Sequence, residues 1–140
     1  MVLSRKIFID SSVLYSFIDR ADSNHSNSVK TIEQLSLQEV SLYTSLQTIQ
    51  DTFNAIKNQL GSTLSYDFLE VITNSNIEIL FPQKSDLITA YRIIKSNRTK
   101  QLSLKEVLTA VLMQKRGISR ILTYTYWPNI LGSESYFYRV

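Results

Sequence analysis

Short apolar runs alternate with longer amphipathic segments along most of the chain. The first run lies in residues 5–10 and contains the triplet "IFI", which is rich in β-favouring side chains and too short for an independent helix. It predicts a buried strand. Comparable runs predict strands at 40–44, 77–81 and 118–124, and an edge strand at 136–140.

Apolar residues at helical spacing fill the segments between these strands. In residues 45–60 the side chains of Leu46, Ile49 and Phe53 lie on one stripe, and Gly61 ends the pattern. We therefore expect a helix there. The same reasoning predicts a helix that is capped by Ser11 or Ser12, and further helices at 26–37, 62–74, 85–98 and 104–116.

Strands that alternate with helices predict an α/β fold: a three-layer α/β/α sandwich with a mainly parallel central sheet of about five strands. With 140 residues and 44% hydrophobic content, the chain can bury one sizeable core, so we expect a single domain over residues 1–140. Ligands of such sheets bind beyond the carboxyl ends of the strands, and Asp10 follows the first strand directly.

The composition excludes several kinds of protein. The chain has no cysteine, so neither a disulfide framework nor a thiolate metal site is available. The first apolar run is broken by Asp10 and is too short for a signal peptide, and no segment approaches the roughly 20 apolar residues that span a bilayer. We expect a cytoplasmic protein with no membrane partner. The lone histidine, His25, excludes a His-rich metal site and predicts an incidental structural role.

The charge is unevenly distributed. Residues 1–70 have a net charge of −3, whereas residues 71–140 have a net charge of +6. Such asymmetry fits a surface that meets a polyanion, but solvated lysines on helix faces give the same count. The basic residues that crowd the later segment are Lys95, Arg98, Lys100, Lys105, Arg116 and Arg120.

Three acidic residues are candidates for chemistry, and each has a structural alternative. Asp10 could cap the helix that follows it, through the orphan N–H groups of the first turn. Asp51 lies nearly opposite the apolar stripe of its helix and could be merely solvated. Glu106 follows Ser103 in "SLKE", the pattern of a capping box.

The surroundings of these three residues resemble, in the right order, the motifs of the PIN domains, which include toxin ribonucleases of the VapC type. "IFIDSSVLYSFID" is similar to the family's opening strand and aspartate, and "TSLQTIQD" at 44–51 resembles its second motif. "LSLKEVLTAVLMQKRGISRILTY" at 102–124 is similar to its third motif. The resemblance extends over essentially the whole chain.

The resemblance implies a metal-dependent endoribonuclease that hydrolyses single-stranded RNA with Mg²⁺ or Mn²⁺. Asp10 and Glu106 would bind the metal, and Asp51 would hold it directly or through water, with Ser12 as a polar helper. Two positions have exchanged Asp and Glu relative to the family pattern. Thr125 replaces the family's fourth carboxylate, which removes a ligand for a second metal, and its neutral hydroxyl would support the site by a hydrogen bond to a metal-bound water.

The resemblance also implies partners: single-stranded RNA held by the basic residues, an antitoxin protein, and a second copy of the chain in a homodimer. Near the C-terminus an aromatic group favours core closure or a dimer interface over base stacking. Its members are Tyr124, Tyr126, Trp127, Tyr136, Phe137 and Tyr138.

Three functions therefore remain open from the sequence. The first is the metal-dependent endoribonuclease. The second is a degenerate PIN module that binds RNA or a partner protein without cleavage, which the loss of an acid at Thr125 favours. The third is a dimeric scaffold that uses its aromatic C-terminus.

Overall fold

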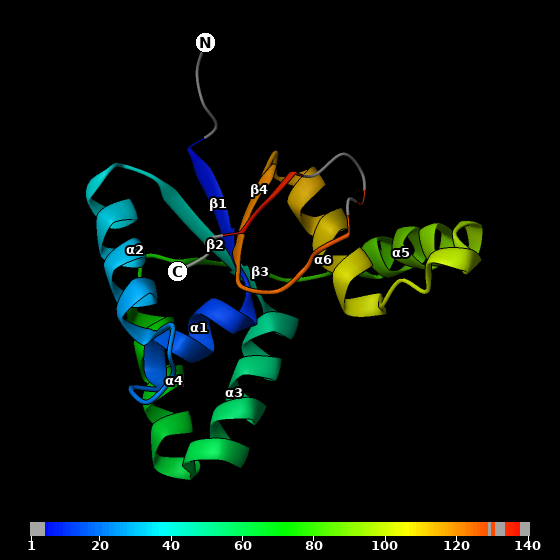
Figure 1. The fold of residues 1–140 in the computed structure, drawn as a ribbon. Helices are drawn as coiled ribbons and strands as arrows, with labels where there is room; N and C mark the ends of the chain where they lie inside the picture. The colour runs from blue at the N-terminus through cyan, green and yellow to red at the C-terminus, as the bar shows by residue number, and fades with distance from the viewer. Residues whose placement is uncertain (1–4, 129, 131–133, 138–140) are drawn as a thin grey trace.

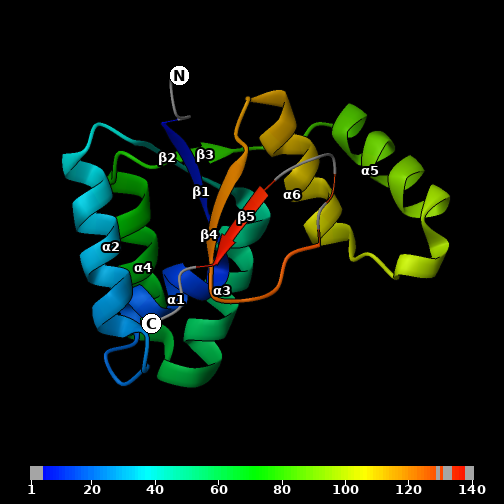
Figure 2. The same ribbon diagram turned by 45° about the horizontal axis from the view of Figure 1, so that its top comes forward.

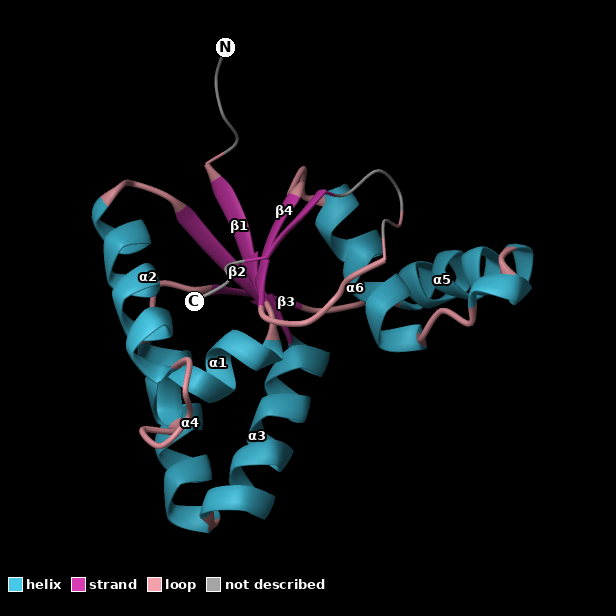
Figure 3. Ribbon diagram, viewed as in Figure 1, coloured by secondary structure: helices cyan, strands magenta, loops and turns pink. Residues whose placement is uncertain are grey.

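The computed structural model of the chain describes residues 5–128, 130 and 134–137. A five-stranded sheet in the order β3-β2-β1-β4-β5 lies at its centre, and every neighbouring pair of strands is parallel. The strands are β1 (Lys6–Ile9), β2 (Ser41–Ser45), β3 (Glu78–Leu80), β4 (Arg120–Thr123) and β5 (Glu134–Phe137) (Figure 3). The predicted fold class is confirmed.

Helices cover both faces of the sheet, and a separate hydrophobic cluster lies under each layer (Figure 1). Because side chains alternate along a strand, Ile7 and Ile9 pack on one face and Phe8 on the other. The first face is covered by α1 (Ser11–Ile18), α2 (His25–Leu37), α3 (Leu46–Leu60) and α4 (Ser62–Asn74). The second is covered by α6 (Leu104–Lys115).

The remaining helix, α5 (Lys84–Ser96), packs on α6 and lies on its far side from the sheet (Figure 2). A short 3-10 helix, η1 (Arg98–Lys100), follows it and leads through residues 101–103 into α6. The helix predicted at 85–98 corresponds to α5 but extends two residues too far, because α5 ends at Ser96 and η1 begins at Arg98.

Other predictions about single residues have clear outcomes. The cap of α1 is Asp10, with Ser11 already inside the helix, so capping by Ser11 or Ser12 was wrong. Trp127 is buried in the cluster below α6, which supports core closure. His25 lies with Nδ1 2.9 Å from the carbonyl oxygen of Ser16. The predicted edge strand at 136–140 lies partly outside the described residues, since 138–140 and thus Tyr138 are not among them.

Within the ranges that the structure describes, no helix is long and apolar enough to cross a bilayer.

Candidate functional site

Asp10 lies where the strand order of the sheet reverses. From β1 the chain adds β2 and β3 on one side and then β4 on the other, so the carboxyl ends of β1 and β4 form the switch point at which such sheets bind ligands. The backbone N–H of Asp10 donates to the carbonyl of Leu122 at 3.0 Å, which fixes the residue at this edge. Only 2% of Asp10 is exposed.

The carboxylate of Asp10 is not used as a helix cap. Its carbonyl oxygen accepts the N–H groups of Val13 and Leu14, both at 3.1 Å, but its side chain makes no capping hydrogen bond. The alternative that the Asp10 side chain caps α1 through the N–H groups of its first turn is therefore wrong. A buried carboxylate needs other partners, because desolvation otherwise disfavours its charge.

Those partners are side-chain hydroxyls. The strongest contacts come from Thr123, whose Oγ1 donates to Asp10 Oδ2 at 2.8 Å, and from Ser12, which donates to the same oxygen at 3.0 Å. Ser11 donates at 3.4 Å and Thr125 at 3.5 Å. Ser12 and Thr125, the two supporting residues predicted from the sequence, therefore both lie beside Asp10.

A lysine occupies the space between the acidic residues. Lys105 Nζ lies 2.7 Å from Asp51 Oδ2 and 4.0 Å from Asp10 Oδ1. It also donates to Ser11 Oγ at 3.1 Å. Asp51 and Lys105 come from the second turn of α3 and the first turn of α6, so the ammonium ties both helices to the end of β1.

The three predicted metal ligands do not gather. Asp51 is half-exposed and reaches Asp10 only through Lys105. Glu106 is half-buried in the first turn of α6, where its backbone N–H donates to Ser103 Oγ at 3.1 Å, as one half of the expected capping box. In the part of the chain that the structure describes, no group of three acidic or histidine side chains could hold a metal ion.

These residues therefore do not fit a divalent cation as arranged. Mg²⁺ requires oxygen ligands that converge at about 2.0–2.1 Å, whereas the point between Asp10 and Asp51 is held by a positive ammonium group. The nearest side chains to Asp10 are neutral hydroxyls, which are weak ligands beside carboxylates.

The predicted basic residues other than Lys105 fall into two groups. Lys95, Arg98 and Lys100 are exposed at the end of α5 and in η1, on the side from which the chain enters α6. Arg116 and Arg120 lie near the amino ends of the strands, away from Asp10, because Arg120 begins β4 and pairs in register with Ile7. There Arg116 is ion-paired with Glu78, and its guanidinium lies 5.6 Å from the centre of the Tyr43 ring.

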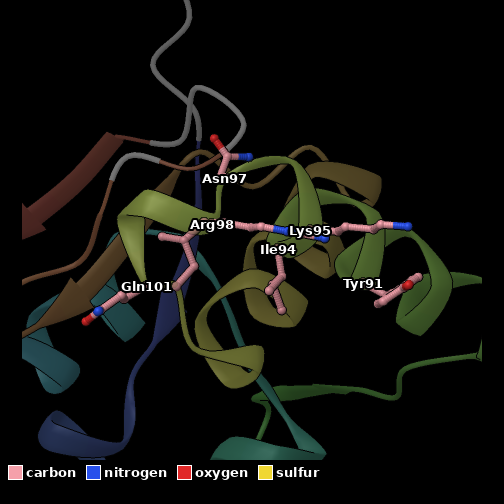
Figure 4. Close-up of a pocket in the computed structure, with 7 residues that line it drawn as sticks. Tyr91, Ile94, Lys95, Asn97, Arg98 and Gln101 are labelled. Atoms are coloured by element: carbon pink, nitrogen blue, oxygen red, sulfur yellow. The ribbon is translucent and has the colours of Figure 1, made fainter.

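A pocket of about 350 Å³ opens beside the first group (Figure 4). It is lined by Tyr91, Ile94, Lys95, Asn97, Arg98, Gln101 and Leu102. Tyr91 is 58% exposed, and Lys95 Nζ lies 5.8 Å from the centre of its ring. Sequence reasoning missed Tyr91, since its position on α5 looks like any apolar position of a surface helix.

Sequence reasoning also missed Thr123 and the role of Lys105 within the site. Thr123 ends β4, the strand beside β1, so the rule that singled out Asp10 could have found it. Nothing in the sequence indicated that Lys105 faces the two aspartates, because that contact depends on how α6 packs against α3.

Comparisons of sequence give no relatives: no family model matches, and no curated protein matches either. Comparison of structures finds proteins with a similar fold. VapC20 from Mycobacterium tuberculosis, described as a sarcin-ricin loop cleaving toxin, has a TM-score of 0.73 at 13% identity over 86% of this chain and 88% of that chain. VapBC2 from Rickettsia felis, solved with a DNA fragment from its promoter, has a TM-score of 0.70 at 9% identity, over 96% and 99%.

FitAB bound to the IR36 DNA fragment is similar as well, with a TM-score of 0.63 at 14% identity over 94% of each chain. The resemblance to VapC-like PIN domains is thus confirmed at the level of the fold.

Proposed function

We propose that this chain is a single-domain, RNA-binding protein with the PIN fold, of the kind that works in a toxin–antitoxin pair, and that it binds single-stranded RNA without metal-dependent cleavage. The observation that carries this proposal is the basic pocket beside Tyr91. The fold likeness to VapC20, a loop-cleaving toxin, supports the class of ligand.

The pocket offers the two contacts that unpaired RNA needs. Lys95, Arg98 and Lys100 are exposed and can neutralise phosphates, which is the main source of affinity for nucleic acids. The exposed ring of Tyr91 can stack on a base, and stacking tolerates any base sequence. A cavity of about 350 Å³ admits an unpaired base but no duplex.

The cations continue from the pocket towards the acidic site. Residues 101–103 connect η1 to α6, and Lys105 lies in the first turn of that helix. A strand that binds at Arg98 and Lys100 would therefore approach the end of β1. Arg116 and Arg120 take no part in this proposal because they lie near the amino ends of the strands, away from the pocket.

A metal-dependent endoribonuclease is the second candidate, and the burial of Asp10 favours it. Asp10 is only 2% exposed and lies at the carboxyl ends of the strands, where such sheets bind ligands. Burying a carboxylate costs desolvation free energy that a purely structural role does not explain. Mg²⁺ or Mn²⁺ would have to displace Lys105 to be held by Asp10, Asp51 and Glu106.

We also propose a protein partner of the antitoxin kind, or a second copy of the chain. The outer side of α5 exposes Leu87 and Ile88, and Phe81 before it is 63% exposed. An apolar helix face of this kind marks an interaction surface. The molar mass in solution, with and without the product of an adjacent small reading frame, tests both partners.

The RNA proposal is tested by fluorescence anisotropy with labelled single-stranded RNA in the presence of EDTA. The variant Lys95→Gln/Arg98→Gln/Lys100→Gln should lose at least about tenfold in affinity, and the slope of log K against log salt should fall by about 2, since each phosphate contact contributes about 0.7. Arg20→Gln/Lys30→Gln/Lys57→Gln removes the same charge from exposed positions on the other face and should bind like the wild type.

Two results would contradict this proposal. Equal weakening in both triple variants would mean that net charge alone attracts the RNA, and no binding by the wild type would remove RNA as the ligand. The same RNAs are then incubated with Mg²⁺ or Mn²⁺. Cleavage by the wild type that disappears in Asp10→Asn would establish the endoribonuclease in its place.

A further inference from the structure

The ammonium group of Lys105 lies at the centre of the acidic site. It contacts Asp51 Oδ2 at 2.7 Å and Ser11 Oγ at 3.1 Å, and it lies 4.0 Å from Asp10 Oδ1. An ammonium group carries three N–H donors, and these three oxygens surround it. Its side chain is only 31% exposed, so it is held within the site rather than in solvent.

The charges explain why the lysine lies there. Asp10 is buried and Asp51 faces the same space, so the two carboxylates would repel one another without a cation between them. Lys105 supplies that positive charge from within the chain. A divalent cation in the same space would meet the ammonium at very short range, where like charges repel strongly.

We propose that Lys105 is the permanent counter-ion of Asp10 and Asp51, in the position that a divalent cation would otherwise take. The wild-type protein therefore binds neither Mg²⁺ nor Mn²⁺ at these carboxylates. Removal of the ammonium group creates a cation site, because two carboxylates are left facing a space that only a cation can neutralise.

The experiment is a titration with Mn²⁺ alone, by calorimetry and by thermal unfolding, on the full chain. Lys105→Met should bind about one Mn²⁺ per chain at least ten times more tightly than the wild type. Its melting temperature should rise with Mn²⁺, because an ion that binds only the folded state stabilises it. The melting temperature of the wild type should not respond.

Two further variants make the result specific. Lys115→Met removes the other lysine that pairs with a buried aspartate, Asp86, and should gain no Mn²⁺ binding because a single carboxylate lies there. Asp10→Asn/Lys105→Met should lose the binding that Lys105→Met gained. If Lys105→Met does not fold, Lys105→Gln replaces it, since glutamine removes the charge and keeps an N–H donor for Asp51.

The proposal is overturned if the wild type binds Mn²⁺ as tightly as Lys105→Met, or if neither Lys105→Met nor Lys105→Gln binds it. Because RNA binding is measured in EDTA, failure of the RNA proposal leaves this result unaffected, and the reverse also holds.

Discussion

The chain buries two aspartates to the same degree, and their surroundings differ. Asp10 and Asp86 are each 2% exposed, and each lies near a lysine. Asp86 is in the first turn of α5, where the backbone N–H of Gln83 donates to its Oδ2 at 2.8 Å and Lys115 Nζ donates to its Oδ1 at 2.8 Å. The Gln83 side chain completes a capping box.

Every close partner of Asp86 can only donate. Burial alone would raise the pKa of Asp86, but the hydrogen bonds from Lys115 and Gln83, with the charge of Lys115, outweigh it and hold that pKa below its ordinary value. This carboxylate starts a helix and attaches α5 to α6.

Asp10 has partners that can both donate and accept. The hydroxyls of Ser12 and Thr123 rotate, and its lysine is shared with Asp51 at a shorter distance. Asp86 is therefore fixed by its surroundings, whereas the side chain of Asp10 faces hydroxyls at the carboxyl end of β1 and makes no capping hydrogen bond. The comparison shows that equal burial does not mean an equal role.

The largest expected effect comes from the same substitution at the two positions. Asp86→Asn turns an amide N–H₂ towards donors, so we expect a loss of about 2 kcal/mol in the free energy of unfolding. Asp10→Asn faces hydroxyls that can reorient to accept, so we expect a loss of about 0.5 kcal/mol. Urea unfolding at pH 7 measures both, and equal losses would contradict the distinction.

The sequence predicted the fold well because the fold depends on periodicity. Strands centred on "IFI" and "VSLYT" and the helix that ends at Gly61 appear where alternation and helical spacing place them. Local chemistry was less predictable. An aspartate before a helix is usually its cap, and only the tertiary position of Thr123 and Ser12 shows that the side chain of Asp10 is turned elsewhere.

The position of the candidate site was predictable from the sequence, but the lysine that lies between its two aspartates was not. Asp10, Ser12 and Thr125 follow neighbouring strands and do meet. Glu106 and Lys105 are adjacent in sequence and point differently from the first turn of α6, so which of them meets Asp10 depends on the rotation of that helix against α3. Helical spacing alone does not fix that rotation.

A second effect follows from the pKa of Asp86. Because this pKa is lower in the folded protein than in the unfolded chain, the carboxylate contributes stability that is complete above the unfolded value, near ~3.9, and is lost as the pH falls through the folded value. The difference in unfolding free energy between the wild type and Asp86→Asn should therefore be constant from pH 7 to about 5 and shrink below about pH 4. A difference that grows on acidification would contradict the sign of the shift.

The smallest effect concerns the two threonines that reach Asp10. Thr123 is fully buried and donates to Asp10 at 2.8 Å, whereas Thr125 is exposed and lies 3.5 Å away. Thr123→Val should cost about 1 kcal/mol in unfolding free energy, since a good hydrogen bond to a buried carboxylate is lost, and Thr125→Val should stay within about 0.5 kcal/mol because water replaces its hydroxyl. A larger loss at Thr125, measured by urea unfolding, would mean that Thr125 and not Thr123 makes the more stabilising hydrogen bond to Asp10. The hydrogen bond from exposed Thr125 would then matter more to Asp10 than the one from buried Thr123. That result would contradict the distinction between Asp86, whose partners are fixed, and Asp10, whose hydroxyl partners can reorient.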